Sequence, residues 1–139
     1  MNKVLIDTSV WSMALRRNKP NKREMQVSEE LANLIREFRI AIIGPVRQEL
    51  LSGISNPTVF EDLKNKMSIF TDYSIWTSDY ELAAEYANFC RRNGIQGSHA
   101  DFLICAVAVK NRWDIFTEDL DFENYQKYLP ITLHECNNI

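Results

Sequence analysis

Four acidic residues stand where a parallel sheet would bring their side chains together. Asp7 directly follows the apolar run 4–6, and Asp119 stands just after a second apolar run. Glu49 and Asp101 each fall in the first turns of an expected helix. The carboxyl ends of parallel strands share one edge of the sheet, and this edge is where ligands bind. We therefore expect the four carboxylates to converge there.

Carboxylates that face one cleft repel one another, which raises their pKa values unless a cation lies between them. No His or Cys cluster accompanies these acids, and oxygen ligands alone favour Mg²⁺ or Mn²⁺ over zinc. Such an ion activates water and neutralises charge on phosphoryl oxygens. We expect Asp7, Asp101 and Asp119 to hold the ion directly or through waters. Glu49 would bind a second ion or orient the water.

Each of these acids also has a simpler explanation. Asp7 and Asp101 suit the start of a helix, where carboxylates accept backbone hydrogen bonds. Glu49 alone would be an ordinary surface residue, and Asp119 and its neighbour Asp121 would be ordinary turn residues. Independent roles of this kind do not explain why all of them fall at one sheet edge. The sequence leaves open whether Asp119 or Asp121 is the fourth ligand.

Two hydroxyl residues accompany the acids. Ser9 and Thr117 stand two residues after Asp7 and two before Asp119. Each is close enough to donate a hydrogen bond to a carboxylate or to a metal-bound water, although Ser and Thr in turns also bond to local backbone. We include both as supporting residues of the candidate site.

Five short apolar runs predict the strands that carry the acids, and amphipathic stretches between them predict helices. The alternation indicates a Rossmann-like α/β fold, a three-layer αβα sandwich with a five-stranded parallel sheet. The expected strands span residues 4–6, 40–43, 73–75, 114–116 and 131–133.

Several helix boundaries can be placed from local signals. Asn56 precedes a proline and Pro45 follows a glycine, so each marks a helix start. Ser78 and Ser98 each precede an acid by three residues, which is the spacing of a capping box. Residues 102–109 are apolar on all sides, as in a buried helix.

Length and charge limit the possible function classes. The chain has 139 residues, which fits one domain over 1–139, and 16 basic against 19 acidic residues give a net charge of −3. This balance excludes a generally basic, phosphate-coating nucleic-acid binder. No apolar run reaches the length of a membrane span or a signal peptide, so we expect a cytoplasmic protein without a membrane partner.

One local basic cluster follows the first expected helix. It contains five cations in eight residues and would serve either as a solvated loop or as an arm that guides RNA to the acids. We name the first three as RNA-binding candidates; the cluster consists of Arg16, Arg17, Lys19, Lys22 and Arg23.

Four motifs in order carry a resemblance to a known family. They are Val4-Leu5-Ile6-Asp7-Thr8-Ser9-Val10-Trp11, Glu49-Leu50-Leu51-Ser52-Gly53, the segment from Asp101 to Ala108, and Phe116-Thr117-Glu118-Asp119-Leu120-Asp121-Phe122. With these motifs the chain resembles the PIN-domain nucleases, and within them the VapC-type toxins of toxin–antitoxin pairs. The resemblance covers nearly the whole chain and predicts a PIN-like fold.

The resemblance implies a site and an activity. It assigns Asp7, Glu49, Asp101 and Asp119 as the four metal-binding acids, with Asp121 as a further candidate. It also implies a toxin that uses Mg²⁺ or Mn²⁺ to hydrolyse RNA phosphodiesters, with transfer or ribosomal RNA as the expected substrate. The expected partners are a second copy in a homodimer and a cognate VapB-type antitoxin. The alternative is a non-catalytic PIN-like module that only binds RNA or protein.

Overall fold

The computed structural model describes residues 2–15 and 19–136. Its centre is a parallel sheet in the order β2-β1-β3. These strands span Ile40–Ala41 (β2), Val4–Ile6 (β1) and Asp114–Phe116 (β3). All three residues of β1 are buried, as expected for a central strand with helices on both faces.

Two of the five expected strands are present only as single bridges. Tyr73 makes one parallel bridge to Ile43, and Leu133 makes one to Ile115. Each of these segments lies at an outer edge of the sheet, one beside the chain that continues β2 and the other beside β3. The described residues therefore contain three strands rather than five, and the prediction of a parallel α/β sheet is confirmed in this coarser form.

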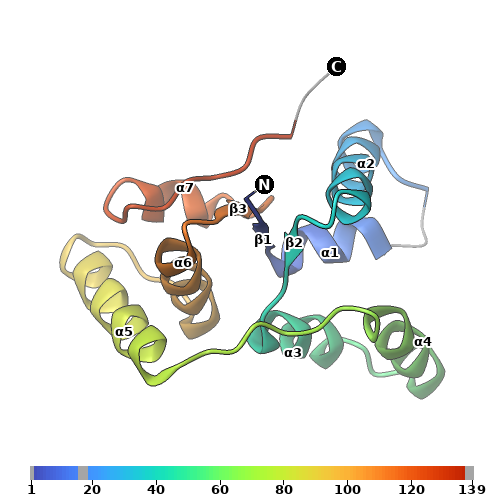
Figure 1. Ribbon diagram of the computed structural model, residues 1–139, viewed down its shortest axis with the longest axis horizontal. Helices are drawn as coiled ribbons and strands as arrows, with labels where there is room; N and C mark the ends of the chain where they lie inside the picture. Colours follow the sequence, from blue (N-terminus) through green and yellow to red (C-terminus); the bar gives the residue numbers. More distant parts are fainter. Residues whose placement is uncertain (1, 16–18, 137–139) are drawn as a thin grey trace.

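Helices lie on both sides of the sheet, with α1 and α2 on one side and α5 and α6 on the other (Figure 1). The pair α3 and α4 lies beyond one end of the strands. This is the layered αβα arrangement that the alternating pattern predicts. The helices are α1 (Thr8–Leu15), α2 (Lys22–Arg36), α3 (Gly44–Ser52), α4 (Pro57–Met67), α5 (Thr77–Arg92), α6 (His99–Asn111) and α7 (Asp121–Gln126).

Most of the expected helix boundaries are confirmed. The Asn56 side chain accepts hydrogen bonds from the first-turn backbone of α4, and Ser98 accepts one from the backbone N–H of Asp101 in α6. Pro45 lies in the first turn of α3. These contacts satisfy backbone groups that the first turn of a helix leaves without partners.

The expected cap at Ser78 is wrong. The cap of α5 is Trp76, two residues before Ser78, and the Asp79 carboxylate accepts a 2.7 Å hydrogen bond from the backbone N–H of Trp76. Asp79 is buried and pairs with Lys110 at 2.9 Å, which ties the start of α5 to the end of α6. Ser78 accepts a hydrogen bond from the same lysine. The acid that caps the first turn of α5 is therefore Asp79, whose carboxylate also pairs with Lys110 of α6.

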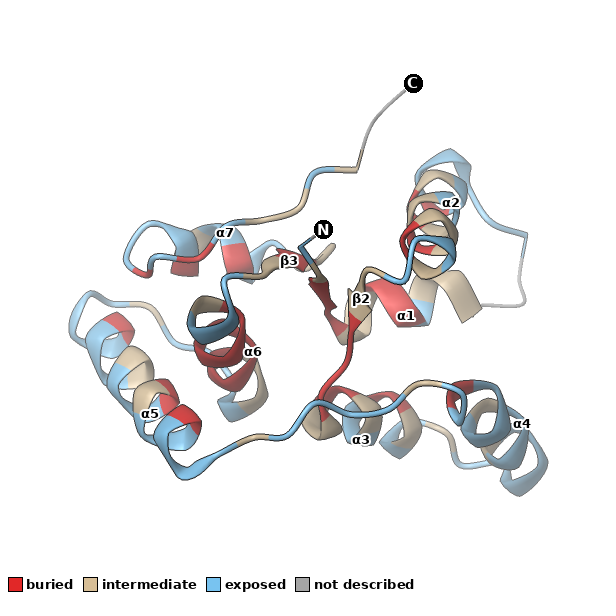
Figure 2. Ribbon diagram, viewed as in Figure 1, coloured by how far each residue is buried: buried red, intermediate tan, exposed pale blue. Residues whose placement is uncertain are grey.

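The core is thickest around α6, whose residues from Phe102 to Ala108 are all buried (Figure 2). This burial stabilises the helix by removing its apolar surface from water. Helix α6 also packs against β3 and α3. In the described ranges, none of the helices is both long and apolar enough to cross a bilayer.

Candidate functional site

Three carboxylates gather at the carboxyl edge of the sheet. Asp101 projects from the first turn of α6, Asp119 from the loop after β3, and Asp121 from the start of α7. One oxygen from each lies within 4.8 Å of the others. The backbone N–H of Asp121 donates a 2.9 Å hydrogen bond to Asp119 Oδ1, which holds the turn between them. This spacing suits oxygen ligands around one divalent cation.

Asp7 lies at the end of β1, beside this group. It is only 4% exposed, and its Oδ2 accepts hydrogen bonds of 2.8 Å from both Ser9 Oγ and Thr117 Oγ1. Burial raises the pKa of Asp7, the two hydroxyl bonds act in the opposite direction, and the charge of Asp119 adds to the rise. The ionised form of Asp7 is therefore costly until a cation or a donor compensates it.

The same hydroxyls hold the loop after β3 in place. Ser9 Oγ accepts a 3.0 Å hydrogen bond from the backbone N–H of Glu118, and Thr117 Oγ1 accepts one of 3.0 Å from Asp119. These bonds connect the end of β1 to a segment more than a hundred residues later. Ser9 and Thr117 thus position Asp119 in addition to bonding Asp7.

Asp101 is half-buried and has a buried partner. The Tyr125 hydroxyl donates a 2.6 Å hydrogen bond to Asp101 Oδ2. The pKa of Asp101 is raised to about 6, mainly by burial and also by the charges of Asp7 and Asp119, while the Tyr125 bond acts in the opposite direction. A bound cation would offset both the lost hydration of this carboxylate and the repulsion from its neighbours.

Glu49 lies on α3 as expected, but its side chain is exposed and stands outside the group of three acids within 4.8 Å. It lines a hollow of about 460 Å³ between α1, α3 and α4, together with Ser12 and Lys66. Helix α3 contacts both α1, which begins directly after Asp7, and α6, whose first turn contains Asp101. The structure therefore brings Asp101, Asp119 and Asp121 within 4.8 Å of one another, with Asp7 near enough for its charge to raise the pKa of Asp101, whereas Glu49 lies outside this group of three acids.

A family comparison decides the identity of this fold. A model of the PIN domain family matches residues 4–128, which is most of the chain. The chain belongs to the PIN domain family.

Solved structures share the fold of this PIN domain at low sequence identity. FitAcB from Neisseria gonorrhoeae is 21% identical, with a TM-score of 0.75 and coverage of 95% of this chain and 96% of that one. DNA-bound VapBC from Salmonella typhimurium is 19% identical, with a TM-score of 0.72 and coverage of 96% and 98%. VapBC2 from Rickettsia felis, bound to a promoter DNA fragment, is 16% identical, with a TM-score of 0.71 and coverage of 94% and 96%. The sequence matches none of the curated proteins with which it was compared.

Sequence reasoning missed two residues that shape the site of this PIN domain. Tyr125 is fully buried, and a Cβ added to Gly97 would overlap its hydroxyl group. Gly97 therefore leaves the space in which Tyr125 reaches Asp101. A tyrosine in this segment carries no sequence signal that distinguishes a partner of Asp101 from an ordinary packed side chain.

The basic cluster is described only in part. Arg16 and Arg17 lie outside the described residues, and Lys19 is exposed. Arg23 forms two hydrogen bonds of 2.8 and 2.9 Å to the carboxylate of Glu118. This pair joins the start of α2 to the residue before Asp119, and both partners line a hollow of about 700 Å³ next to the acids.

Proposed function

We propose that this PIN domain is a metal-dependent endoribonuclease that acts as the toxin of a toxin–antitoxin pair. The observation that carries the proposal is the grouping of Asp101, Asp119 and Asp121 within 4.8 Å, with buried Asp7 beside them. Membership of the PIN family supports it, because the sequence motifs that resemble the family's nucleases are the segments that supply these acids.

The chemistry of the donor set fits Mg²⁺ or Mn²⁺. All candidate ligands are carboxylate oxygens, and the pKa values of Asp7 and Asp101 are raised mainly by burial and partly by neighbouring carboxylates, both of which a divalent cation would offset. We propose that Asp101, Asp119 and Asp7 hold the ion, with Asp121 as an additional ligand. When bound, such an ion lowers the pKa of a water molecule and neutralises charge on the phosphoryl oxygens.

The chain's own residues would orient this reaction. Ser9 and Thr117 hold Asp7 and the Asp119 loop, and Tyr125 holds Asp101. We propose that Glu49 orients the attacking water or holds a second ion. The water attacks the phosphorus in line with the leaving oxygen, the P–O bond breaks, and no covalent enzyme intermediate forms.

The proposed partners come from the family and from the folds that the chain resembles. We propose a cytoplasmic homodimer whose substrate is transfer or ribosomal RNA. The similar VapBC structures are bound to DNA, and the name VapBC denotes two proteins, VapB and VapC. We propose by analogy that a cognate VapB-type antitoxin inhibits this chain. Arg16, Arg17 and Lys19 would guide the RNA.

Cleavage of total cellular RNA tests the proposed activity. Purified, antitoxin-free protein is incubated with Mg²⁺ or Mn²⁺ or with EDTA, alongside Asp101→Asn and the matched control Glu85→Gln on the exposed face of α5. We expect discrete fragments from the wild type and the control only when metal is present. Equal cleavage by Asp101→Asn would reject the assigned site, and absence of cleavage by any protein would favour a non-catalytic binding module.

A further inference from the structure

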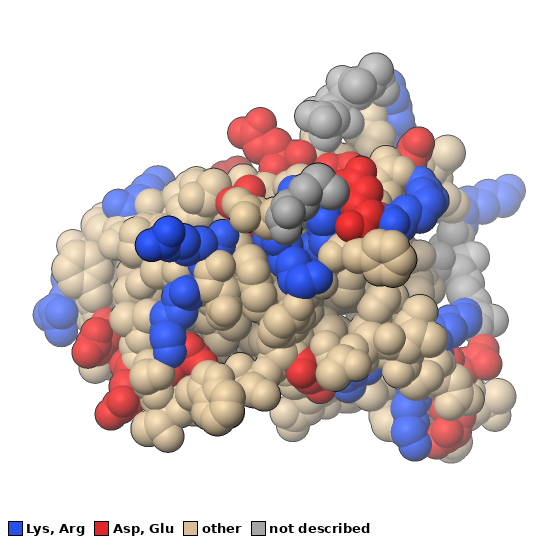
Figure 3. Space-filling view, in the orientation of Figure 1, with Lys and Arg blue, Asp and Glu red and all other residues tan. Residues whose placement is uncertain are grey.

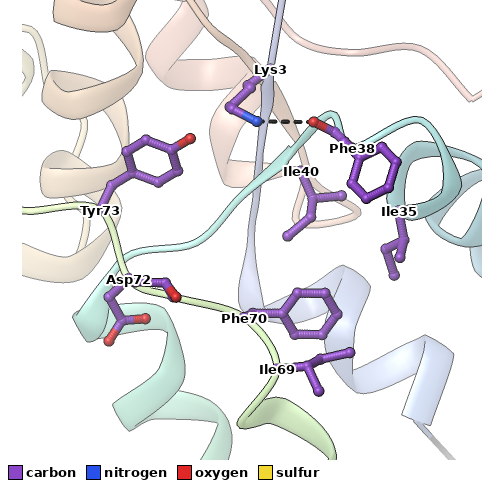
Figure 4. A pocket seen from close by; sticks show the side chains of 9 residues that line it. Lys3, Ile35, Phe38, Ile40, Ile69, Phe70, Asp72 and Tyr73 are labelled. Carbon is purple, nitrogen blue, oxygen red and sulfur yellow. Dashed lines mark hydrogen bonds between the residues drawn. The ribbon is translucent and has the colours of Figure 1, made fainter.

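A second feature, separate from the acids, is an apolar groove of about 520 Å³ beside β2 (Figure 4). It lies between the end of α2 and the segment 69–73, next to the residues with which β1 and β2 begin. The acids lie at the opposite, carboxyl edge of the sheet. The floor of the groove consists of Ile35, Ile40 and Phe70, and the Phe70 ring packs on Trp11 with centroids 5.2 Å apart.

The rim of the groove exposes two large apolar side chains. Phe38 is 84% exposed and Ile69 is 77% exposed. Contiguous exposed apolar surface of this kind marks interaction sites more often than isolated residues do. In the close-up view, both side chains lie on the same side as the floor residues Ile35, Ile40 and Phe70.

The backbone of Phe38 makes this exposure unusual. Its φ is 57°, in the left-handed region that bulky residues rarely adopt. The backbone N–H groups of Phe38 and Arg39 donate to the carbonyls of Ile35 and Leu34, the pattern that ends a helix with a glycine in most proteins. The left-handed conformation of Phe38 thus costs conformational energy, and its side chain gains little burial in this chain. Coverage of its ring by a partner accounts for a phenylalanine at this position.

The charges around the groove restrict what could cover it. Lys3 Nζ donates a 2.9 Å hydrogen bond to the carbonyl of Phe38, and among the described residues it forms no ion pair with a carboxylate. The acid that lines the groove, Asp72, is already paired with Arg47 at 2.9 Å. The groove therefore presents apolar surface next to one uncompensated cation. A second copy docked symmetrically would bring another Lys3, together with an Asp72 that is already paired with Arg47.

We propose that this groove binds a peptide segment of a partner protein. The segment presents an apolar side chain to Ile35, Ile40 and Phe70 and a carboxylate to Lys3. Phe38 and Ile69 close over the apolar side chain from the rim. This binding site is independent of the proposed nuclease function, because it uses none of the acids and no metal.

Methyl NMR locates such binding directly, because three isoleucines line the groove. The δ1-methyl signals of Ile35, Ile40 and Ile69 are followed while the probe peptide N-acetyl-Leu-Phe-Glu-amide is added to the full chain. We expect these three signals to shift and the core isoleucines Ile6 and Ile104 to stay unchanged. A peptide with Lys in place of Glu should bind about threefold to fivefold more weakly at low salt, because it loses the pairing with Lys3.

Two variants separate binding from folding. Phe38→Gly keeps the left-handed helix end and relieves its strain, so we expect an equal or higher melting temperature together with weaker peptide binding. Lys3→Gln should bind both peptides equally. The matched control Met25→Ser, at another exposed apolar residue of α2 (58% exposed), should bind like the wild type.

Three results would overturn the proposal. One is the absence of shifts at the groove isoleucines at about 10 mM peptide, which is beyond the range of specific binding. Another is unchanged binding by Phe38→Gly. The third is a set of shifts that depend on protein concentration without peptide, because these would show that a second copy occupies the groove. The assay contains neither RNA nor metal, so its failure is distinct from a failure of the proposed nuclease activity.

Discussion

At the scale of single residues, the acids of this PIN domain differ in their burial and in the hydrogen bonds that stabilise their carboxylates. Asp7 is buried and takes two hydroxyl bonds, whereas Asp101 is half-buried and takes one from Tyr125. The positions of Asp7 and Asp101 could be predicted because each follows a strand or begins a helix with a clear local signal. The role of Tyr125 could not, since a buried tyrosine on a helix face has the same sequence pattern as a phenylalanine.

Asp101 makes the stability of the metal-free protein depend on pH. Its pKa rises from 3.8 to about 6 on folding, so the folded state binds more protons than the unfolded state between these values. The free energy of unfolding therefore falls as pH rises through this window. We expect wild-type protein in EDTA to lose more stability between pH 4 and pH 7 than Asp101→Asn, as measured by urea unfolding. Parallel stability curves would contradict the raised pKa.

Tyr125→Phe removes the hydroxyl that bonds Asp101. Because this bond lowers the pKa of Asp101, its loss should move the acidic limb of the pH profile of kcat/KM to higher pH. The lost buried hydrogen bond should also reduce the free energy of unfolding by about 1–3 kcal/mol. Tyr128→Phe is the control, because its ring is partly exposed at the end of the same segment. An unchanged pH profile in Tyr125→Phe would show that the hydroxyl has only a packing role.

At the scale of helices and strands, local sequence signals predicted where helices begin better than they predicted how far strands pair. The starts of α4 and α6 follow from the local capping contacts of Asn56 and Ser98, and the start of α3 follows from Pro45 in its first turn. The extent of a strand depends on neighbours distant in sequence, so the runs at 73–75 and 131–133 proved to be single bridges. The start of α5 shifted for the same reason, because Lys110 from α6 holds Asp79.

Arg47 holds the chain from the end of α4 to residue 72 in place. From the first turns of α3, its guanidinium donates to the carbonyls of Met67 and Phe70 at 2.9 and 2.6 Å and pairs with Asp72. Arg47→Ala would leave these acceptors without a donor, so we expect a loss of about 2–3 kcal/mol in the free energy of unfolding. Arg36→Ala, at an exposed position, should cost less than about 0.5 kcal/mol. Equal losses in urea unfolding would mean that water replaces the Arg47 contacts.

At the scale of the whole molecule, charge is mixed over the visible surface and the net charge is −3 (Figure 3). The proposed cleavage of RNA would require this acidic protein to attract phosphates locally, and the sequence contains one dense cationic segment. The structure adds that Arg23, at the end of this segment, is tied to Glu118 beside the acids. The sequence could not show this proximity, since the two residues lie 95 positions apart.

Charge reversal tests the guiding role of the basic segment. Replacement of Arg16, Arg17 and Lys19 by Glu should weaken RNA binding and flatten its dependence on salt, because fewer counterions are released from RNA. The measurement is the apparent Kd for single-stranded RNA at several salt concentrations, with Asp101→Asn as the background that prevents cleavage. The control replaces Lys64 and Lys66 on α4 by Glu. An unchanged slope in the triple variant would exclude these residues from RNA guidance.

The central claim is that the acids at the carboxyl edge of the sheet form one cation site. Electron paramagnetic resonance of Mn²⁺ titrated into the purified chain measures this directly, because bound Mn²⁺ loses the sharp signal of the free ion. We predict saturable binding by the wild type and by Glu85→Gln, and at least tenfold weaker binding by Asp119→Asn, because removal of a charged ligand costs more than about 1.4 kcal/mol. Equal Mn²⁺ affinity in wild type and Asp119→Asn would contradict the assignment.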